Sequence, residues 1–278
     1  DGIRDRDVTG VQTCALPILS PGAGSGLGDW SGTAYQWWSV DAMTDEIRTR
    51  PDGAVAVVTG AGGGIGRATA LRLSGQGLSV AVLDIDGNLA DETVQMVRAR
   101  DGRAVAYQGD VSSEDDVAQL LQAIHESQGP VGILANVAGI QSPNARVRDL
   151  SLEEWQRVLG VNLNGTFFWS RAVIPDMLNL RWGRIVVTSS VLGLRGRPGT
   201  AAYATSKAAL LGFTRSLALE LADKGITANA ILPSMVDTML VRRHATEEQV
   251  RARGRELNIG RVAEADEVAS AIEYLVSS

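Results

Sequence analysis

The chain has 278 residues, of which 26 are basic and 32 acidic, so its formal net charge is −6. An acidic chain without a basic stripe is atypical of nucleic-acid binders, and a single cysteine, Cys14, excludes a disulfide framework and a thiolate metal site. No apolar run reaches the roughly 18 residues of a membrane span, and no signal peptide is recognisable. We therefore expect a cytoplasmic protein that binds neither nucleic acid nor membrane.

The first 42 residues lack the patterns of folded elements. Asp1 to Ile18 resembles a translated sequencing adapter, and residues 19–42 are rich in Gly, Ser and Trp without a helical or strand period. We expect a non-native or disordered leader over residues 1–42, a natural start at Met43, and one domain over residues 43–278. Finding the codons of the first 18 residues at the source locus would contradict the adapter hypothesis.

After the leader, short apolar runs alternate with longer helical patterns. The runs are apolar throughout, which is typical of strands covered on both faces. Strand-helix alternation with short connections predicts an α/β fold with a doubly wound parallel sheet, the Rossmann fold, in a single domain. The expected strands are Ala54–Val58, Ser79–Leu83, Ala104–Tyr107, Gly132–Ala135, Arg184–Thr188 and Thr227–Leu232. The expected helices are Ile65–Ser74, Leu89–Arg100, Ser113–Glu126, Leu152–Leu180, Thr200–Lys224 and Asp266–Val276.

A glycine-rich turn, Thr59-Gly-Ala-Gly-Gly-Gly-Ile-Gly66, joins the first expected strand to the first helix. Such glycines let the backbone approach a pyrophosphate, and the helix amino terminus supplies donors. Asp84 ends the second strand, where a carboxylate can accept hydrogen bonds from ribose hydroxyls and repel a 2′-phosphate. No arginine follows Asp84 or stands at Gly63, so the sequence favours NAD over NADP. The alternatives are a plain tight turn for the glycines and a turn or capping role for Asp84, since Asp86, Gly87 and Asn88 follow it.

Tyr203 and Lys207 are four residues apart on an expected helix, downstream of the pair Ser189 and Ser190. Residues at this spacing share a helix face, so a phenol and an ammonium can flank one reacting group, and the ammonium favours the phenolate. Lys207 is one of only two lysines in the chain, which is typical of a site that needs a compact cation. This pattern predicts acid/base chemistry on an alcohol or ketone, with a serine hydroxyl on the substrate oxygen.

Taken together, these motifs resemble the classical short-chain dehydrogenase/reductase family from about Gly53 onward. The resemblance implies that Ser190, which lies 13 residues before Tyr203, acts with Tyr203 and Lys207, and that Asn162 positions a water in a proton relay. Val137 and Ser234 depart from the family pattern. The implied cofactor-binding positions are Gly60, Gly64, Ile65, Gly66, Asp84, Asp110, Val111, Asn136, Ala138, Gly139, Tyr203, Lys207, Pro233, Val236 and Thr238.

The function expected on this basis is an NAD(H)-dependent oxidoreductase that interconverts a secondary alcohol and a ketone. An NADPH-dependent 3-oxoacyl-thioester reductase is the alternative within the family, and a non-catalytic nucleotide-binding regulatory module is the alternative outside it. Ser142, Asn144 and side chains from Met239 to Ile259 are expected to line the substrate pocket. No cluster of His, Cys or carboxylates at ligand spacing indicates a metal.

The carboxyl end departs from the family pattern. Relatives continue into one more parallel strand, whereas this sequence ends soon after the last expected helix. We therefore expect a truncated domain of six strands with an uncovered edge beside the sixth. A homodimer or homotetramer is expected only if the carboxyl end is complete.

Overall fold

The computed structural model describes residues 11–13, 49–242 and 246–277, and its centre is a sheet of order β1-β7-β6-β5-β2-β3-β4. Six strands run parallel, as predicted. They are β2 (Val55–Thr59), β3 (Ser79–Asp84), β4 (Arg103–Gln108), β5 (Val131–Asn136), β6 (Gly183–Thr188) and β7 (Ile226–Pro233). The chain runs outward from β2 to β4 and then from β5 to β7, so the switch in strand order lies between β2 and β5.

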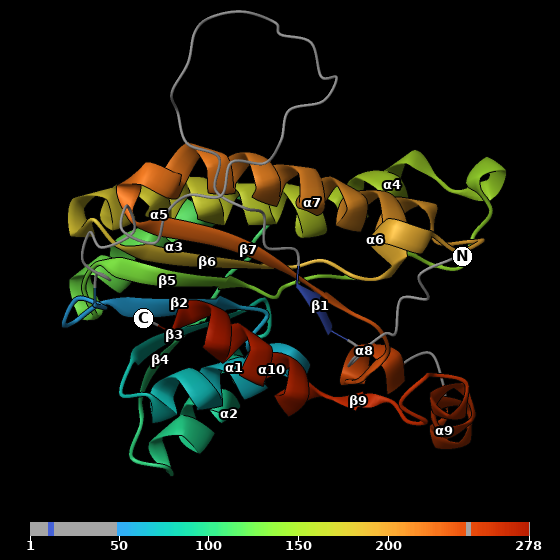
Figure 1. Cartoon of the computed structure of the whole chain (residues 1–278), viewed down its shortest axis with the longest axis horizontal. Helices are drawn as coiled ribbons and strands as arrows, with labels where there is room; N and C mark the ends of the chain where they lie inside the picture. Colours follow the sequence, from blue (N-terminus) through green and yellow to red (C-terminus); the bar gives the residue numbers. More distant parts are fainter. Residues whose placement is uncertain (1–10, 14–48, 243–245, 278) are drawn as a thin grey trace, which may run out of the picture.

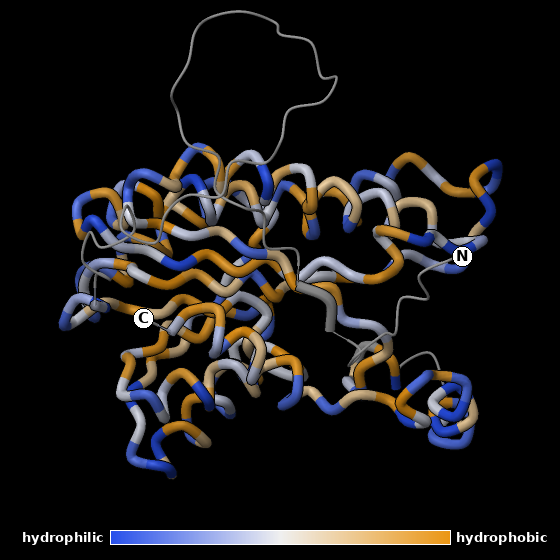
Figure 2. Tube along the Cα trace, in the orientation of Figure 1, coloured by the Kyte–Doolittle hydropathy of each residue, from blue (hydrophilic) through white to orange (hydrophobic). Residues whose placement is uncertain are grey.

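Helices cover both faces of this sheet (Figure 1). One face carries α1 (Gly64–Gly75), α2 (Gly87–Arg98) and α10 (Ala265–Val276); the other carries α3 (Glu114–Ser127), α4 (Leu152–Leu159), α5 (Gly165–Leu180) and α7 (Ala201–Leu221). Each face has its own apolar core, with Trp182 fully buried in one and Trp169 in the other. Figure 2 shows apolar residues concentrated along the central strands. In the described part of the chain, no helix has the length and apolar character needed to cross a bilayer.

Shorter elements follow the carboxyl ends of β6 and β7. They are α6 (Leu192–Arg195), α8 (Met239–Arg242), α9 (Glu247–Arg255) and a two-stranded sheet of β8 (Val236–Asp237) and β9 (Ala263–Glu264). A capping box is present at α9, where the Thr246 and Gln249 side chains each accept a hydrogen bond from the other residue's backbone N–H. These elements lie beside the carboxyl edge of the sheet, where doubly wound folds bind ligands.

The predicted helical segment over residues 152–180 is present, but its regular α-helical geometry is interrupted. A π-helical turn, Gly160–Asn164, separates α4 from α5. Such turns hold an extra residue and frequently occur at functional sites. The turn contains Asn162, whose side chain makes hydrogen bonds to other segments of the chain.

The sheet edge beside β7 also differs from the expectation. β1 (Val11–Thr13) pairs antiparallel with residues 231–233 of β7, so the edge is covered over these three positions. A part of the expected leader therefore pairs with the sheet. The rest of residues 1–42 lies outside the described residues, and the described strands leave residues 226–230 of β7 unpaired on this side. The strand at Val11–Thr13 was not predicted, because three residues are too few to show the periodic pattern by which a strand is recognised in a sequence.

On the face of the sheet that carries α1 and α2, α10 packs along α1, although 194 residues separate Arg72 from Asp266. The Arg72 guanidinium donates to Asp266 at 2.7 Å and to Glu273 at 2.7 Å. Val268 and Ile272 of α10 are fully buried in the core, and Leu275 is partly buried against it. The last described helix therefore forms an outer layer over the β2-α1-β3 unit.

Candidate active site

A cleft opens at the carboxyl ends of the strands. It brings together three of the four predicted catalytic residues and several predicted cofactor positions. Its lining consists of Ile65, Val137, Gly139, Gln141, Thr188, Ser189, Ser190, Tyr203, Lys207, Pro233, Ser234, Val236, Thr238 and Val241. Gln141 was not predicted from the sequence.

Helix α7 carries both Tyr203 and Lys207 into this cleft. The Lys207 side chain is buried, its Nζ donates to the Thr188 carbonyl at 2.7 Å, and Nζ lies 5.8 Å from the centroid of the Tyr203 ring. Burial lowers the pKa of Lys207 to about 8, because a low-dielectric environment disfavours the ammonium. The predicted pair therefore lies together, with the amine poised to titrate near neutral pH.

The electrostatics of Tyr203 differ from the expectation that Lys207 would lower the phenol pKa. Burial is the largest influence and raises the pKa of Tyr203, while the Ser190 hydroxyl and the positive charge of Arg197 lower it. The sequence analysis missed Arg197, which precedes α7 in a loop without a recognisable motif. Its backbone carbonyl accepts a hydrogen bond from Thr200 Oγ1 at 2.8 Å, so the loop is tied to the start of α7.

The two adjacent serines have different surroundings. Ser189 Oγ donates to the Lys207 carbonyl at 2.7 Å and so joins β6 to α7. Ser190 Oγ accepts from the Leu192 N–H at 3.2 Å and lies beside the phenol of Tyr203. The geometry therefore favours Ser190 over Ser189 as the residue that meets a substrate oxygen.

Asn162 lies behind the cleft with no exposed surface. Its Oδ1 accepts from the Ile140 N–H at 2.8 Å, and its Nδ2 donates to the Ile140 carbonyl and to Ser206 Oγ, both at 3.0 Å. The side chain thus makes polar contacts that hold the segment after β5 and helix α7 to the π-helical turn. A role in a water relay stays a prediction.

The glycine loop is shaped by close approach to the end of β5. Gly60 has a φ of +65°, and a Cβ there would lie 2.8 Å from Ala138 Cα. A Cβ at Gly66 would collide with the Gly60 carbonyl. Thr59 Oγ1, another residue that the sequence analysis did not select, accepts from the Val137 and Ala138 N–H groups at 3.1 Å each. The glycine loop and the segment after β5, which both contain predicted cofactor-binding residues, are therefore held together by these contacts.

Two observations fit a dinucleotide at this site. Helix α1 begins at Gly63 without a side-chain cap or an acidic residue in its first turn, so its first N–H groups can serve an anion. Thr188 Oγ1, on the cleft wall, is buried without a hydrogen-bond partner among the described residues. Buried polar atoms of native proteins are usually paired, so the wall suits a polar ligand. No group of three or more His, Cys, Asp or Glu side chains in the described ranges could hold a metal ion.

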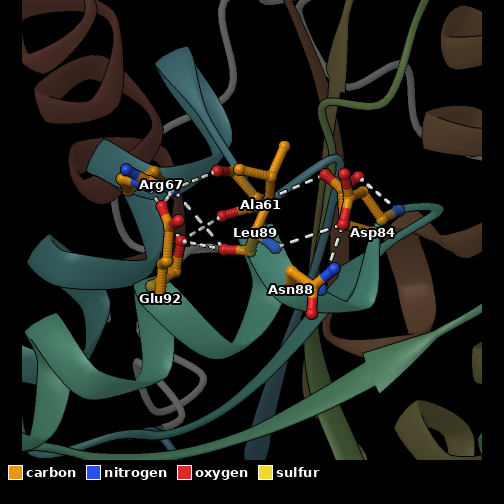
Figure 3. Close-up of polar contacts among 9 residues, drawn as sticks. Ala61, Arg67, Asp84, Asn88, Leu89 and Glu92 are labelled. Carbon is orange, nitrogen blue, oxygen red and sulfur yellow. Dashed lines mark hydrogen bonds and ion pairs between the residues drawn. The ribbon is translucent and has the colours of Figure 1, made fainter.

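Asp84 ends β3, as predicted, and both of its carboxylate oxygens accept backbone donors (Figure 3). Oδ2 accepts from the Gly62 N–H at 2.8 Å, and Oδ1 accepts from the Asp86 N–H at 3.0 Å. The cap of α2 is Asp86, which accepts from the Asn88 N–H at 3.0 Å. The capping role considered for Asp84 therefore belongs to Asp86, whereas Asp84 makes the turn contact considered for it, by accepting from the Asp86 N–H.

The remaining predicted positions surround the cleft rather than line it. Asp110 Oδ1 accepts from Ser112, Asn136 Nδ2 donates to Ser170 Oγ at 3.3 Å, and Val111 packs near Gly165. Most of the expected substrate wall also lies outside the described cleft lining. Among the described cleft-lining residues, only Val241 comes from 239–259, and Asn144 contacts Gly199 instead. Residues 243–245 lie outside the described residues.

Comparisons with known proteins agree with this geometry. The short chain dehydrogenase family model matches residues 54–249. A 3-oxoacyl-[acyl-carrier-protein] reductase of Synechocystis is 37% identical, covering 80% of this chain and 89% of that protein. A cyclohexanol dehydrogenase of Acinetobacter is 35% identical, with 80% and 87% covered. A crystal structure of an actinorhodin polyketide ketoreductase variant with NADPH has a TM-score of 0.78 at 36% identity, with 83% and 92% covered.

Proposed function

Since the chain belongs to the short-chain dehydrogenase family and is an NAD(P)-dependent oxidoreductase acting on CH–OH groups, we propose that it interconverts a secondary alcohol and a ketone with NAD(H). The observation that carries this proposal is the convergence of Ser190, Tyr203 and Lys207 in one cleft beside the glycine loop. A phenol, a hydroxyl and a buried amine at that place suit proton transfer to and from a substrate oxygen.

In the proposed oxidation, Tyr203 removes the hydroxyl proton while Ser190 holds the same oxygen. Lys207 lies behind the phenol, tied to β6 by its bond to Thr188. The nicotinamide, when bound, supplies the hydride acceptor. Gly60, Gly64, Ile65 and Gly66 would hold the pyrophosphate, and Pro233, Val236 and Thr238 would flank the nicotinamide end.

The proposed preference for NAD rests on Asp84. Its carboxylate stands at the end of β3, where a 2′-phosphate would meet a negative charge. Arg67, which lies near Gly62, is already engaged by Glu92 at 3.0 Å and by Thr93 at 2.9 Å. It therefore does not offer an uncommitted cation to a 2′-phosphate.

A panel of alcohols and ketones, followed by the absorbance of NADH and NADPH, tests the proposal. We expect turnover with at least one secondary alcohol or ketone and a higher kcat/KM with NAD(H). Tyr203→Phe should reduce turnover by at least a thousandfold while NADH binding changes less than twofold, because only the transferable proton is removed. Ser190→Ala should also impair turnover strongly, whereas Ser189→Ala should retain most activity. Substantial activity in Tyr203→Phe would show that another group is the acid/base.

The second candidate is an NADPH-dependent 3-oxoacyl-thioester reductase. It is favoured by the identity to the Synechocystis reductase and to a Pseudomonas aeruginosa reductase of the same name, which is 38% identical with 81% of this chain and 90% of that protein covered. Turnover of 3-oxoacyl thioesters with NADPH, and none of simple ketones with NADH, would select it. Turnover of any of these substrates excludes a non-catalytic regulatory module.

We also propose that the chain forms a homodimer or homotetramer through α5 and α7. Phe167 of α5 is 40% exposed and meets Phe213 of α7 edge-on at 6.3 Å, and Leu178 and Leu219 are exposed on the same two helices. Burial of such apolar surface favours association. Sedimentation of the full chain at several concentrations tests this proposal.

A further inference from the structure

Two consecutive peptide groups at the centre of the glycine loop are held by side chains from outside the loop. In the first, the Ala61 carbonyl accepts from Thr93 Oγ1 at 2.9 Å and the Gly62 N–H donates to Asp84 Oδ2 at 2.8 Å. In the second, the Gly62 carbonyl accepts from Arg67 Nη2 (Figure 3). Three side chains from α1, α2 and β3 thus fix the orientation of a segment that is mostly glycine.

Arg67 is well anchored for this contact. It follows Gly66 on α1, and its guanidinium reaches across to α2, where Nε donates to Thr93 Oγ1 at 2.9 Å and Nη2 pairs with Glu92 at 3.0 Å. The side chain of Arg67 is only 25% exposed. A planar guanidinium can hold several acceptors at once in fixed directions, which a lysine cannot reproduce.

The orientation of these peptides decides which groups face a ligand. In a trans peptide the N–H points away from the carbonyl of the same unit. Because Arg67 holds the Gly62 carbonyl, the Gly63 N–H of that unit points away from Arg67. Glycines adopt many backbone conformations, so without the arginine this unit could turn and present its carbonyl to an anion instead.

We infer that Arg67 is a positioning residue for the cofactor pyrophosphate, acting through the Gly62 peptide, and that Asp84 supports the same loop from the other side. This inference rests on the proposed use of a nicotinamide dinucleotide. Asp84 therefore has two tasks: it selects the ribose and it holds the loop. Changing Asp84 to alter cofactor preference will weaken binding of both cofactors as well.

The test compares Arg67→Met with Arg72→Met. Both arginines lie on α1 and both make ion pairs to another helix, but the described ion pairs of Arg72 join it to Asp266 and Glu273 of α10 rather than to the loop. Calorimetry with NADH, NADPH, ADP-ribose and adenosine should show that Arg67→Met weakens the three pyrophosphate ligands about tenfold. Adenosine binding and the NADH-to-NADPH ratio should stay unchanged. Arg72→Met should leave all four affinities within twofold, and Arg67→Lys should recover part of the loss.

Two further measurements separate positioning from general destabilisation. At saturating cofactor, Arg67→Met should keep kcat within about twofold, so that the loss lies in the KM of the cofactor. Amide exchange without ligand should show a protected Gly62 N–H in the wild type and in Arg72→Met, and faster exchange in Arg67→Met. Because Arg67 and Asp84 act on one loop, the double variant with Asp84→Ala should lose less ADP-ribose affinity than the two single losses combined.

Unchanged ADP-ribose affinity in Arg67→Met, or an equal loss in Arg72→Met, would overturn the inference. Binding of ADP-ribose by the wild type without turnover of any substrate would overturn only the proposed oxidoreductase reaction and leave Arg67 testable. A wild type that binds no pyrophosphate ligand would overturn both.

Discussion

Burial acts on Tyr203 and Lys207 in opposite directions, since it raises the pKa of the phenol and lowers that of the amine to about 8. In both groups it favours the neutral form. The proposed base therefore depends on nearby dipoles and charges, and the structure provides Ser190 and Arg197. The pKa of Tyr203 should therefore shift when a single charge near the phenol is changed.

The charge of Arg197 can be tested by its effect on the pH profile. Arg197 lowers the pKa of Tyr203, so Arg197→Gln should raise it. Alcohol oxidation increases with pH as Tyr203 loses its proton, so the rising limb of the kcat/KM profile should move to higher pH. Arg148→Gln is the control, because Arg148 is 82% exposed and paired with Asp149. If the rising limb of the profile does not move in Arg197→Gln, the charge of Arg197 does not lower the pKa of Tyr203.

Lys207 should reduce stability at neutral pH. Its folded pKa of about 8 lies below the ordinary 10.5, so the unfolded chain holds the proton more tightly. At about 1.4 kcal/mol per pH unit, this destabilises the fold by roughly 3 kcal/mol below pH 8, and the effect disappears as pH rises to 10.5. Replacing Lys207 would remove this destabilisation but would also remove the hydrogen bond to the Thr188 carbonyl, which costs about 1 kcal/mol.

Lys207→Met should therefore be inactive but more stable than the wild type by about 2 kcal/mol at pH 7. Urea denaturation at pH 7 and pH 10 measures the difference, and the gain should vanish at the higher pH. Lys224→Met is the matched control, since Lys224 is half exposed beside Asp223 and should show no such gain. A wild type that is the more stable protein at pH 7 would contradict the burial argument.

At the scale of elements, the sequence predicted the six parallel strands because each is a short apolar run with a distinct helix after it. It also predicted the Tyr203–Lys207 pair, because that contact depends on spacing within one helix. The π-helical turn was not predictable in this way. It depends on Asn162 meeting Ile140 and Ser206, which are distant in sequence. The contacts of Arg67 with α2 were not predicted for the same reason, whereas Arg197 was not predicted because its loop has no recognisable motif.

Asn162 supports the π-helical turn and the segment after β5 together. Asn162→Leu should leave the partly buried N–H and carbonyl of Ile140 and the Ser206 hydroxyl without these partners and destabilise the protein by about 2–4 kcal/mol. It should also lower kcat by at least tenfold, because the segment with Gly139 and Gln141 lines the cleft. Denaturation and steady-state kinetics measure both effects. Thr166→Val, which removes only a bond to the Asn162 carbonyl, should cost about 1 kcal/mol and keep activity.

At the scale of the whole molecule, β1 covers the carboxyl end of the β7 edge. A chain without residues 1–42 should keep its affinity for NADH, because the described residues of this segment pair only with β7 and lie outside the described cleft lining. It should associate more readily, since an unpaired edge offers backbone groups to other chains. Calorimetry and light scattering at several concentrations measure the two outcomes. Unchanged light scattering would show that β1 does not protect the edge.

The packing of α10 on α1 also has a consequence for synthesis on the ribosome. Arg72 and Asp266 are 194 residues apart, so at 5–20 residues per second the partner of α1 emerges roughly 10 to 40 s later. During this interval the β2-α1-β3 unit exists with one apolar helix face uncovered. The nascent chain should therefore bind chaperones that recognise apolar segments, and it should release them only after α10 leaves the exit tunnel.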